Sequence, residues 1–176
     1  MTAPILHRYT TPLGEMVALF SARGLCLLEF CDQAGVPREQ RQVEAARGGP
    51  AREGENAQTA ALGAQLAAYF AGERQSFDLP LDPVGTPFQQ QVWQALLRIP
   101  YGQTRSYGEQ AAFIERPTAT RAVAAANGQN KISIVVPCHR VIGRDGSLTG
   151  YGGGLPRKRW LLALEQAGAP PQRPAG

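Results

Sequence analysis

Two adjacent residues in the C-terminal half of the chain, Cys138 and His139, have types that could perform nucleophilic chemistry. They follow Pro137 and the β-branched run of residues 132–136. We expect that run to be a buried, extended segment that fixes the cysteine in place. Because neighbouring side chains of an extended chain point in opposite directions, His139 would act on Cys138 through a water molecule or a bend in the backbone. A Cys-His dipeptide alone is a weak indication of a nucleophile.

Glu165 adds a third group. The last predicted helix covers residues 156–167, and Glu165 falls on its apolar stripe, four residues after Leu161, whereas we assign Lys158 to its charged face. An unpaired buried carboxylate is costly, and His139 is the only histidine in this half of the chain. Glu165 would then orient the imidazole and favour its charged form, which makes the thiol easier to ionise. The alternative is a carboxylate at the rim, paired with an arginine.

The elements that must position these residues begin with a small antiparallel sheet in the first 84 residues. Short apolar runs separated by turn residues predict three strands, at 5–9, 16–20 and 25–30. Residues 32–58 are poor in apolar side chains and predict mainly loop, with a surface helix at 37–46. A helix follows with Thr59 as its N-cap and ends near Gly72.

The second part, residues 85–176, predicts a mainly helical domain. A helix capped by Thr86, a short one opened by the capping box of Ser106 and Glu109, and a third over 118–126 follow one another. A turn of about four residues between the last two indicates a helix-turn-helix. The predicted fold class is α+β: an N-terminal α/β domain (1–84) of mostly structural role, then a helical C-terminal domain.

The predicted helix over 118–126 has unusually little bulk. It carries one charge, Arg121, among alanines, threonines and one valine. Such small side chains allow another surface to approach closely, as when a helix lies in a narrow groove of DNA. Tight packing against another helix would account for the same composition, and the helix alone leaves both explanations open.

The charges are distributed unevenly. The chain has 18 Lys and Arg against 14 Asp and Glu, for a net charge of +4. Residues 1–84 hold 7 basic and 10 acidic groups, residues 85–165 hold 10 and 4, and Arg173 adds one more. This asymmetry suits a half that binds a polyanion, and solvated surface arginines are the alternative.

Composition excludes other classes of protein. With 43% hydrophobic residues the chain can bury a core. It has neither a signal peptide nor an apolar run long enough for a bilayer, so we expect a soluble, cytoplasmic protein. Cys26, Cys31 and Cys138 are too few for a disulfide scaffold; the first two are expected to be buried thiols rather than a pair.

The segment Pro137-Cys138-His139-Arg140-Val141-Ile142-Gly143 resembles the active-site signature of the O6-alkylguanine-DNA alkyltransferases. Further matches occur in the family's order and spacing across residues 85–167. They are Tyr107, Arg121-Ala122-Val123, Asn130, Tyr151-Gly152-Gly153-Gly154-Leu155 and Trp160-Leu161-Leu162 with Glu165. The N-terminal half resembles the family's small sheet domain through far less specific motifs.

The resemblance implies a DNA repair protein that acts once. Cys138 would take the O6-alkyl group of a flipped-out guanine irreversibly, as a transferase that consumes itself and needs no cofactor. His139 and Glu165 would activate the thiol, and Asn130 would tie the turn before the active site to the helix-turn-helix. Tyr107 would face the flipped nucleotide and donate its hydroxyl to the leaving guanine.

The resemblance also implies a set of DNA contacts. The helix over 118–126 would lie in the minor groove of double-stranded DNA, and Arg121 would fill the gap left by the extruded base. The residues assigned to DNA or base binding are Tyr107, Arg121, Ala122, Ala125, Ala126, Asn127, Arg140, Val141, Tyr151 and Gly152. The protein would act as a monomer, on O6-alkylguanine and as a further candidate on O4-alkylthymine.

The chain departs from the family's pattern at three places. Lys131 stands where many relatives have proline, and Gly152 stands where some have serine. Some relatives hold a structural zinc in the N-terminal part, where this chain offers His7, Cys26 and Cys31; we therefore predict no metal.

Three other functions compete with this interpretation. A non-repairing alkyltransferase-like sensor of alkylated DNA would lack the cysteine and typically have tryptophan there. A cysteine hydrolase using Cys138, His139 and Glu165 would leave the alanine-rich helix unexplained. A plain helix-turn-helix regulator would need no Cys-His-Glu set.

Overall fold

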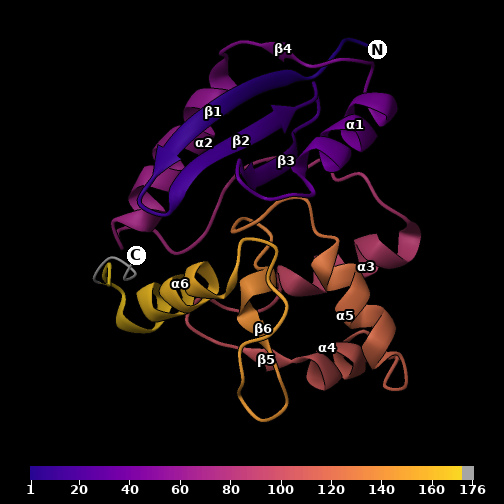
Figure 1. Cartoon of the computed structure of the whole chain (residues 1–176), viewed down its shortest axis with the longest axis vertical. Coiled ribbons are helices and arrows are strands. Elements are labelled where there is room, and N and C mark those ends of the chain that lie inside the picture. Colours follow the sequence, from indigo (N-terminus) through magenta and orange to yellow (C-terminus); the bar gives the residue numbers. More distant parts are fainter. Residues whose placement is uncertain (172–176) are drawn as a thin grey trace. The chain divides into compact units, whose positions relative to one another are not determined.

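The computed structural model describes residues 1–171, and the chain folds into two compact units, Met1–Val84 and the part from Gly85 onward (Figure 1). Arg173, counted above among the basic residues, lies outside the described residues. No helix within residues 1–171 is long and apolar enough to cross a membrane.

The first unit is built on a sheet of four strands in the order β3-β2-β1-β4. Its antiparallel part is formed by β1 (Ile5–Thr11), β2 (Gly14–Phe20) and β3 (Leu25–Phe30), which confirms the three predicted strands. The two-residue strand β4 (Arg52–Glu53) pairs in parallel with β1 and lies in the segment predicted to be mainly loop.

Two helices flank this sheet. The helix α1 (Val36–Ala46) packs through Val36 and Val43 against Leu6 and its neighbours on one face. The helix α2 (Ala57–Phe70) accepts a 2.8 Å hydrogen bond at the carbonyl of Thr59 from the hydroxyl of Tyr9. Because Leu6 and Tyr9 point to opposite faces of β1, the two helices cover opposite faces.

The start of α2 differs from the prediction. Its N-cap is Asn56, and Thr59 is the third residue of the helix, bonded back to Asn56 in a capping box. Asparagine is among the strongest N-cap residue types, so the helix begins at Asn56, three residues before the predicted cap.

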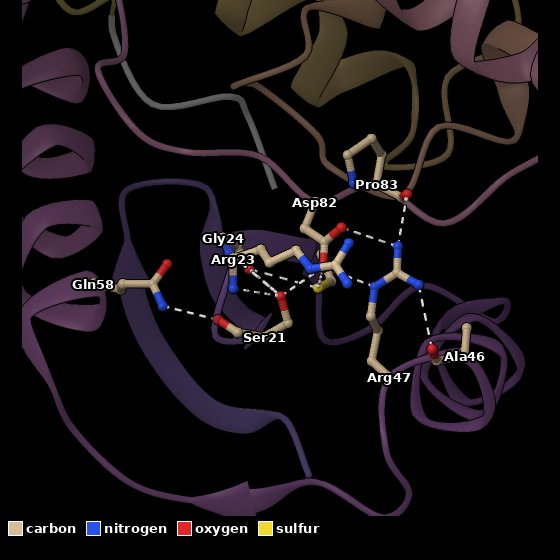
Figure 2. Close-up of polar contacts among 9 residues, drawn as sticks. Ser21, Arg23, Gly24, Ala46, Arg47, Gln58, Asp82 and Pro83 are labelled. Atoms are coloured by element: carbon tan, nitrogen blue, oxygen red, sulfur yellow. Dashed lines mark hydrogen bonds and ion pairs between the residues drawn. The ribbon is translucent and has the colours of Figure 1, made fainter. Parts of the chain in front are cut away.

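An ion pair fixes the last residues of the first unit. Asp82 accepts hydrogen bonds from Arg47 Nε at 2.8 Å and Nη2 at 3.0 Å, and from the Ser21 hydroxyl at 2.6 Å (Figure 2). Backbone bonds join Leu25 to Pro80 and Asp82. The segment before the second unit is therefore held against β3 and α1.

The second unit consists mainly of helices, as predicted. These are α3 (Pro87–Leu96), α4 (Tyr107–Phe113), α5 (Thr120–Gly128) and α6 (Leu155–Ala167), with a 3-10 turn η1 at Cys138–Arg140. Thr86 caps α3 and Ser106 caps α4 through a capping box with Glu109, as the sequence predicted. Two short parallel strands, β5 (Arg105–Ser106) and β6 (Val141–Ile142), join the start of α4 to the chain after Cys138.

The helix-turn-helix is present with different bounds. Six residues, 114–119, separate α4 from α5, rather than about four, and α5 begins at Thr120 rather than 118. It also continues through Asn127 and Gly128, which were expected to end it. The buried side chain of Asn127 reaches the carbonyl of Cys138 from inside α5, a tertiary contact that the local sequence does not indicate.

Candidate functional site

The segment before Cys138 is a series of tight turns. Residues 132–136 are buried as predicted but do not form an extended strand. Backbone hydrogen bonds run from Val135 N to Ser133 O at 2.8 Å, from Val136 N to Ile132 O at 3.0 Å and from Cys138 N to Val136 O at 2.8 Å. A β-branched run usually favours a strand, and the prediction failed because hydrogen bonds within residues 130–138 fold the segment into turns instead.

The side chain of Asn130 adds further hydrogen bonds to these turns. Its buried Nδ2 donates to the carbonyls of Val136 at 3.0 Å and Ile132 at 3.2 Å, and its Oδ1 accepts from Ile132 N at 3.0 Å. Ile134, in the middle of the same segment, has φ of +72°, which is costly for a β-branched residue. The structure therefore holds a strained loop in one conformation directly before the candidate nucleophile.

His139 is completely buried and contacts Glu165. The distance from His139 Nε2 to Glu165 Oε2 is 2.7 Å, and the side chain of Glu165 is 1% exposed. The contact expected from the apolar stripe of the last helix is thus present. The other ring nitrogen, His139 Nδ1, is buried without a hydrogen-bond partner among the described residues.

Arg140 makes the most extensive contact with Glu165. Its Nε lies 2.7 Å from Oε1 and its Nη2 lies 3.0 Å from Oε2, while Nη1 donates to the carbonyl of Ile99 at 2.7 Å. This forked pairing is the strong geometry for arginine and carboxylate. The sequence assigned Arg140 to DNA contact, whereas the structure turns its buried guanidinium inward.

The protonation of this group follows from burial and from the fixed charge of Arg140. Burial acts to raise the pKa of Glu165, but the hydrogen bond from His139 and the hydrogen bonds and fixed charge of Arg140 outweigh it and hold that pKa well below its usual range. Burial lowers the pKa of His139, and this outweighs the attraction of Glu165. The imidazole is therefore neutral at rest, contrary to the charged form expected from the sequence.

A neutral imidazole beside an ionised carboxylate has one consistent tautomer. Glu165 can only accept, so Nε2 of His139 carries the hydrogen and donates it. The lone pair is then on Nδ1. His139 can accept a proton at that atom.

Lys158 is a residue of the site that the sequence analysis missed. It is fully buried, and its Nζ donates to the carbonyls of Val141 at 2.6 Å and Thr149 at 2.8 Å. Burial lowers its pKa, and negative charge on Cys138 would act in the opposite direction. Lys158 stands three, four and seven residues before Leu161, Leu162 and Glu165, so helical periodicity could have placed it on the buried stripe.

Tyr107 and the segment from Val141 to Gly152 lie on the same side of the second unit. The hydroxyl of Tyr107 donates to the carbonyl of Thr149 at 3.3 Å, and the β5–β6 pairing joins Ser106 to Ile142. Val141 and Tyr151 are buried, and Gly152 is exposed. The parallel pair therefore positions Tyr107 close to the chain that follows Cys138.

The surface of α5 contains part of the predicted DNA-binding set. Arg121, Ala122 and Ala125 are exposed, whereas Ala126 and Asn127 are buried. The carbonyl of Ala126 accepts a 2.9 Å hydrogen bond from Trp93 Nε1. The two explanations for the small side chains of this helix therefore apply to different faces. The face with Ala126 packs on α3, and the face with Arg121, Ala122 and Ala125 is exposed and open to another surface.

Within residues 1–171, no three His, Cys, Asp or Glu side chains come together in a way that could hold a metal ion. Cys26, Cys31 and Cys138 are all thiols rather than members of a disulfide; Cys26 is buried as expected, whereas Cys31 is exposed, contrary to the prediction.

Two family models match the chain. The one described as 6-O-methylguanine DNA methyltransferase, ribonuclease-like domain, matches residues 6–83, and the one described as the DNA binding domain of the same family matches residues 87–167.

Individual proteins also match. The methylated-DNA--protein-cysteine methyltransferase of Mycobacterium leprae is 59% identical over 156 residues, which cover 89% of this chain and 88% of the relative. The protein of the same name from Mycobacterium bovis is 66% identical over 106 residues, 60% of this chain, and the match spans 64% of that relative. Among solved structures, Mycobacterium tuberculosis OGT in complex with DNA superposes with a TM-score of 0.83 at 47% identity, over 94% of this chain and 95% of that one.

Proposed function

The chain belongs to the 6-O-methylguanine DNA methyltransferase family, and we propose that it repairs DNA by moving the O6-alkyl group of a damaged guanine irreversibly onto Cys138. The observation that carries this proposal is the buried chain of contacts from Arg140 through Glu165 to His139, directly beside Cys138. Such a chain has a chemical purpose only if a proton must leave the neighbouring thiol.

The first step is proton transfer. His139 Nδ1 accepts the thiol proton through one water molecule, because Nε2 is already bonded to Glu165. Glu165 then faces an imidazolium, and the ammonium of Lys158 faces a thiolate. Both charges formed in this step therefore have an opposite charge nearby.

The second step is displacement at the alkyl carbon. The Cys138 sulfur forms a bond to that carbon, the bond from carbon to guanine O6 breaks, and its electron pair goes to guanine. Tyr107 donates its hydroxyl hydrogen to the leaving base and regains one from the imidazolium through solvent. In the net reaction the thiol proton ends on guanine and the alkyl group on sulfur, so the protein reacts once.

DNA would be held by the exposed face of α5. Arg121, Ala122 and Ala125 present a narrow surface with a single cation, which suits insertion into the minor groove with Arg121 replacing the extruded base. The base itself would lie against Tyr107, Tyr151 and the main chain of Val141 and Gly152. The carbonyl of Val141 already accepts from Lys158, and its second lone pair can accept from guanine.

Several finer points belong to the same proposal. O4-alkylthymine presents an equivalent alkyl–oxygen bond and is a second candidate substrate. The protein acts as a monomer, because the described residues of the second unit contain every side chain that the mechanism uses. Its place of action is the cytoplasm, in contact with DNA.

The test is the intact mass of the protein after incubation with a duplex that carries one O6-methylguanine. The proposal predicts a single gain of the mass of one CH₂ group, mapped by peptide analysis to Cys138. Cys138→Ser should gain nothing and still bind the duplex. Tight binding of the lesion by the wild type without any gain in mass would instead indicate a damage sensor.

Two further variants test the relay. His139→Ala and Glu165→Ala should slow alkyl transfer and leave affinity for DNA largely intact. If either change abolished DNA binding in a folded protein, the relay assignment would be wrong.

A further inference from the structure

Arg140 contacts Glu165 in a way that exceeds what anchoring of a helix requires. Its forked bonds of 2.7 and 3.0 Å reach both carboxylate oxygens, one of which also contacts His139. Its third bond fixes the guanidinium on the carbonyl of Ile99. Arginine remains protonated in proteins. A permanent positive charge is therefore bonded to the same carboxylate as the imidazole.

The charges around His139 come from few groups. From η1 it faces Cys138 and Arg140, and from α6 it faces Glu165 and Lys158. The helix α3, which also packs on this turn, contains no ionisable side chain. The guanidinium carbon of Arg140 lies over the ring of Tyr101, 5.8 Å from the ring centre.

The balance of these charges decides where a proton can sit. With Arg140 in place, the Arg140–Glu165 pair is neutral, and a proton that His139 took from solvent would leave a net positive charge in a buried site. A proton taken from Cys138 is balanced by the thiolate that it leaves. Without Arg140, the His139–Glu165 pair would carry a net negative charge and would take up a proton readily. That proton would either make an imidazolium or, if held by Glu165, force the opposite tautomer. In both cases Nδ1 of His139 would carry a hydrogen.

We propose that Arg140 is a positioning residue of the relay: it neutralises and orients Glu165, so that Nδ1 of His139 stays bare and can accept the Cys138 proton. This inference rests on the proposed function for its meaning and concerns the same site. It replaces the DNA contact that the sequence assigned to Arg140. A purely structural role, in which Arg140 only ties Ile99 to α6, predicts no effect on where the proton sits.

The decisive measurement is nuclear magnetic resonance of the imidazole ring. The chain has only two histidines, and a His7→Gln variant assigns the remaining signals to His139. Nitrogen shifts distinguish the imidazolium and the two neutral tautomers directly. The wild type should show a neutral ring with its hydrogen on Nε2 at neutral pH; an imidazolium in the resting wild type would overturn the proposal even if no variant folded.

Two variants separate charge from geometry. Arg140→Gln removes the charge and should place a hydrogen on Nδ1 at neutral pH. The pH at which the His139–Glu165 pair takes up this proton should rise by at least about one unit. Arg140→Lys keeps the charge and loses the fork, so Nδ1 should remain bare while transfer slows because Glu165 is held less firmly. If both variants protonated the ring equally, or neither did, charge would not be the cause, and the proposal would fail.

The rate of alkyl transfer against pH gives a second readout. In Arg140→Gln the acid limb of the profile should move to higher pH by the same amount as the ring titration, whereas a structural defect would scale the rate equally at every pH. Arg47→Gln is the matched control, because it removes an equally forked arginine–carboxylate pair in the first unit (Figure 2). It should lower stability and leave the shape of the profile unchanged.

The ring titration needs no substrate. If the wild type fails to gain an alkyl group from damaged DNA, the proposed function fails, and the resonances still decide whether Arg140 keeps the proton off His139. The two ideas can therefore be rejected separately.

Discussion

The side chain of Asn127, in the helix that we propose lies on DNA, donates from Nδ2 to the main-chain carbonyl of Cys138 at 3.5 Å. Both residues are buried. The helix α5 and the nucleophile are thus joined by a direct contact in addition to the turns that Asn130 organises. A displacement of α5 on binding would therefore act on the position of Cys138.

Asn127→Ala should slow alkyl transfer about fivefold to tenfold, the effect of losing one hydrogen bond worth about 1 kcal/mol. Its Oδ1 has no hydrogen-bond partner among the described residues, so the free energy of unfolding should fall by no more than about 1–2 kcal/mol. The measurements are single-turnover rates and thermal unfolding. Gln129→Ala, at an exposed position just after α5, is the control, and equal rates in both variants would contradict the coupling.

The sequence was sufficient for the parts of the site that a helical pattern or a contiguous motif encodes. The resemblance based on residues 137–143 is confirmed by the family models. The position of Glu165 on the apolar stripe of the last helix was enough to predict its contact with His139. A carboxylate on a buried stripe must find a partner, and that constraint can be applied without coordinates.

The same constraint, applied to cations, would have found Lys158 but not Arg140. Both were assigned from the usual behaviour of their residue types, as a charged surface and as a DNA contact, and both are buried. Lys158 shares the stripe of Glu165, so the pattern was present in the sequence. Arg140 offered no such pattern, because its burial depends on the carbonyl of Ile99, which lies just after α3 and 41 residues earlier in the chain.

The shape of the loop before Cys138 was beyond local reasoning. Residues 132–136 have the composition of a strand, yet Asn130 folds them into turns, and Ile134 takes a positive φ. Such strain persists only where surrounding contacts outweigh it. The strand predicted from the sequence and the turns in the structure differ because of the contacts of a single buried amide, that of Asn130.

Arg121→Ala should impair repair of duplex DNA far more than reaction with a free O6-alkylated guanine base. Arg121 is exposed on α5, and its proposed role is to fill the stack after extrusion, an effect worth a few kcal/mol and hence about tenfold or more in rate. Single-turnover rates on both substrates measure it. Arg41→Ala, an exposed arginine of α1, removes the same charge elsewhere, and equal losses on both substrates in Arg121→Ala would refute the role.

Lys158→Met should lower both stability and transfer rate. The ammonium donates to the carbonyls of Val141 and Thr149, and a thioether of similar length removes both hydrogen bonds. The carbonyl of Thr149 then keeps its 3.3 Å bond from the Tyr107 hydroxyl, so the main cost is about 1–3 kcal/mol for the carbonyl of Val141. Chemical denaturation and single-turnover rates give the two effects. Arg159→Met, at the exposed neighbouring position, should change neither, and a Lys158→Met protein as stable and active as this control would contradict the assignment.

Glu165→Gln should change how stability depends on pH. The pKa of Glu165 lies below its usual value of 4.5 because the hydrogen bond of His139 and the hydrogen bonds and charge of Arg140 outweigh burial. Its contribution to stability is therefore complete above pH 4.5 and is lost as pH falls further. At neutral pH the variant should be less stable by about 3–5 kcal/mol, the usual cost of breaking a buried pair.

The difference in unfolding free energy between wild type and Glu165→Gln should therefore narrow as pH falls below 4.5. Burial lowers the pKa of His139 from the usual 6.5. Below pH 6.5 the unfolded chain therefore binds a proton at this histidine before the folded chain does, and the stability of both proteins declines separately from that pH downward. Asp82→Asn provides the comparison. Burial of Asp82 is outweighed by hydrogen bonds from Ser21 and Arg47, which lower its pKa from 3.8. The difference in unfolding free energy between wild type and Asp82→Asn should therefore narrow only below pH 3.8. Denaturant titrations at each pH measure these differences in unfolding free energy. If the difference between wild type and Glu165→Gln stayed constant from pH 6 to pH 3, Glu165 would not be the ionised centre of the relay.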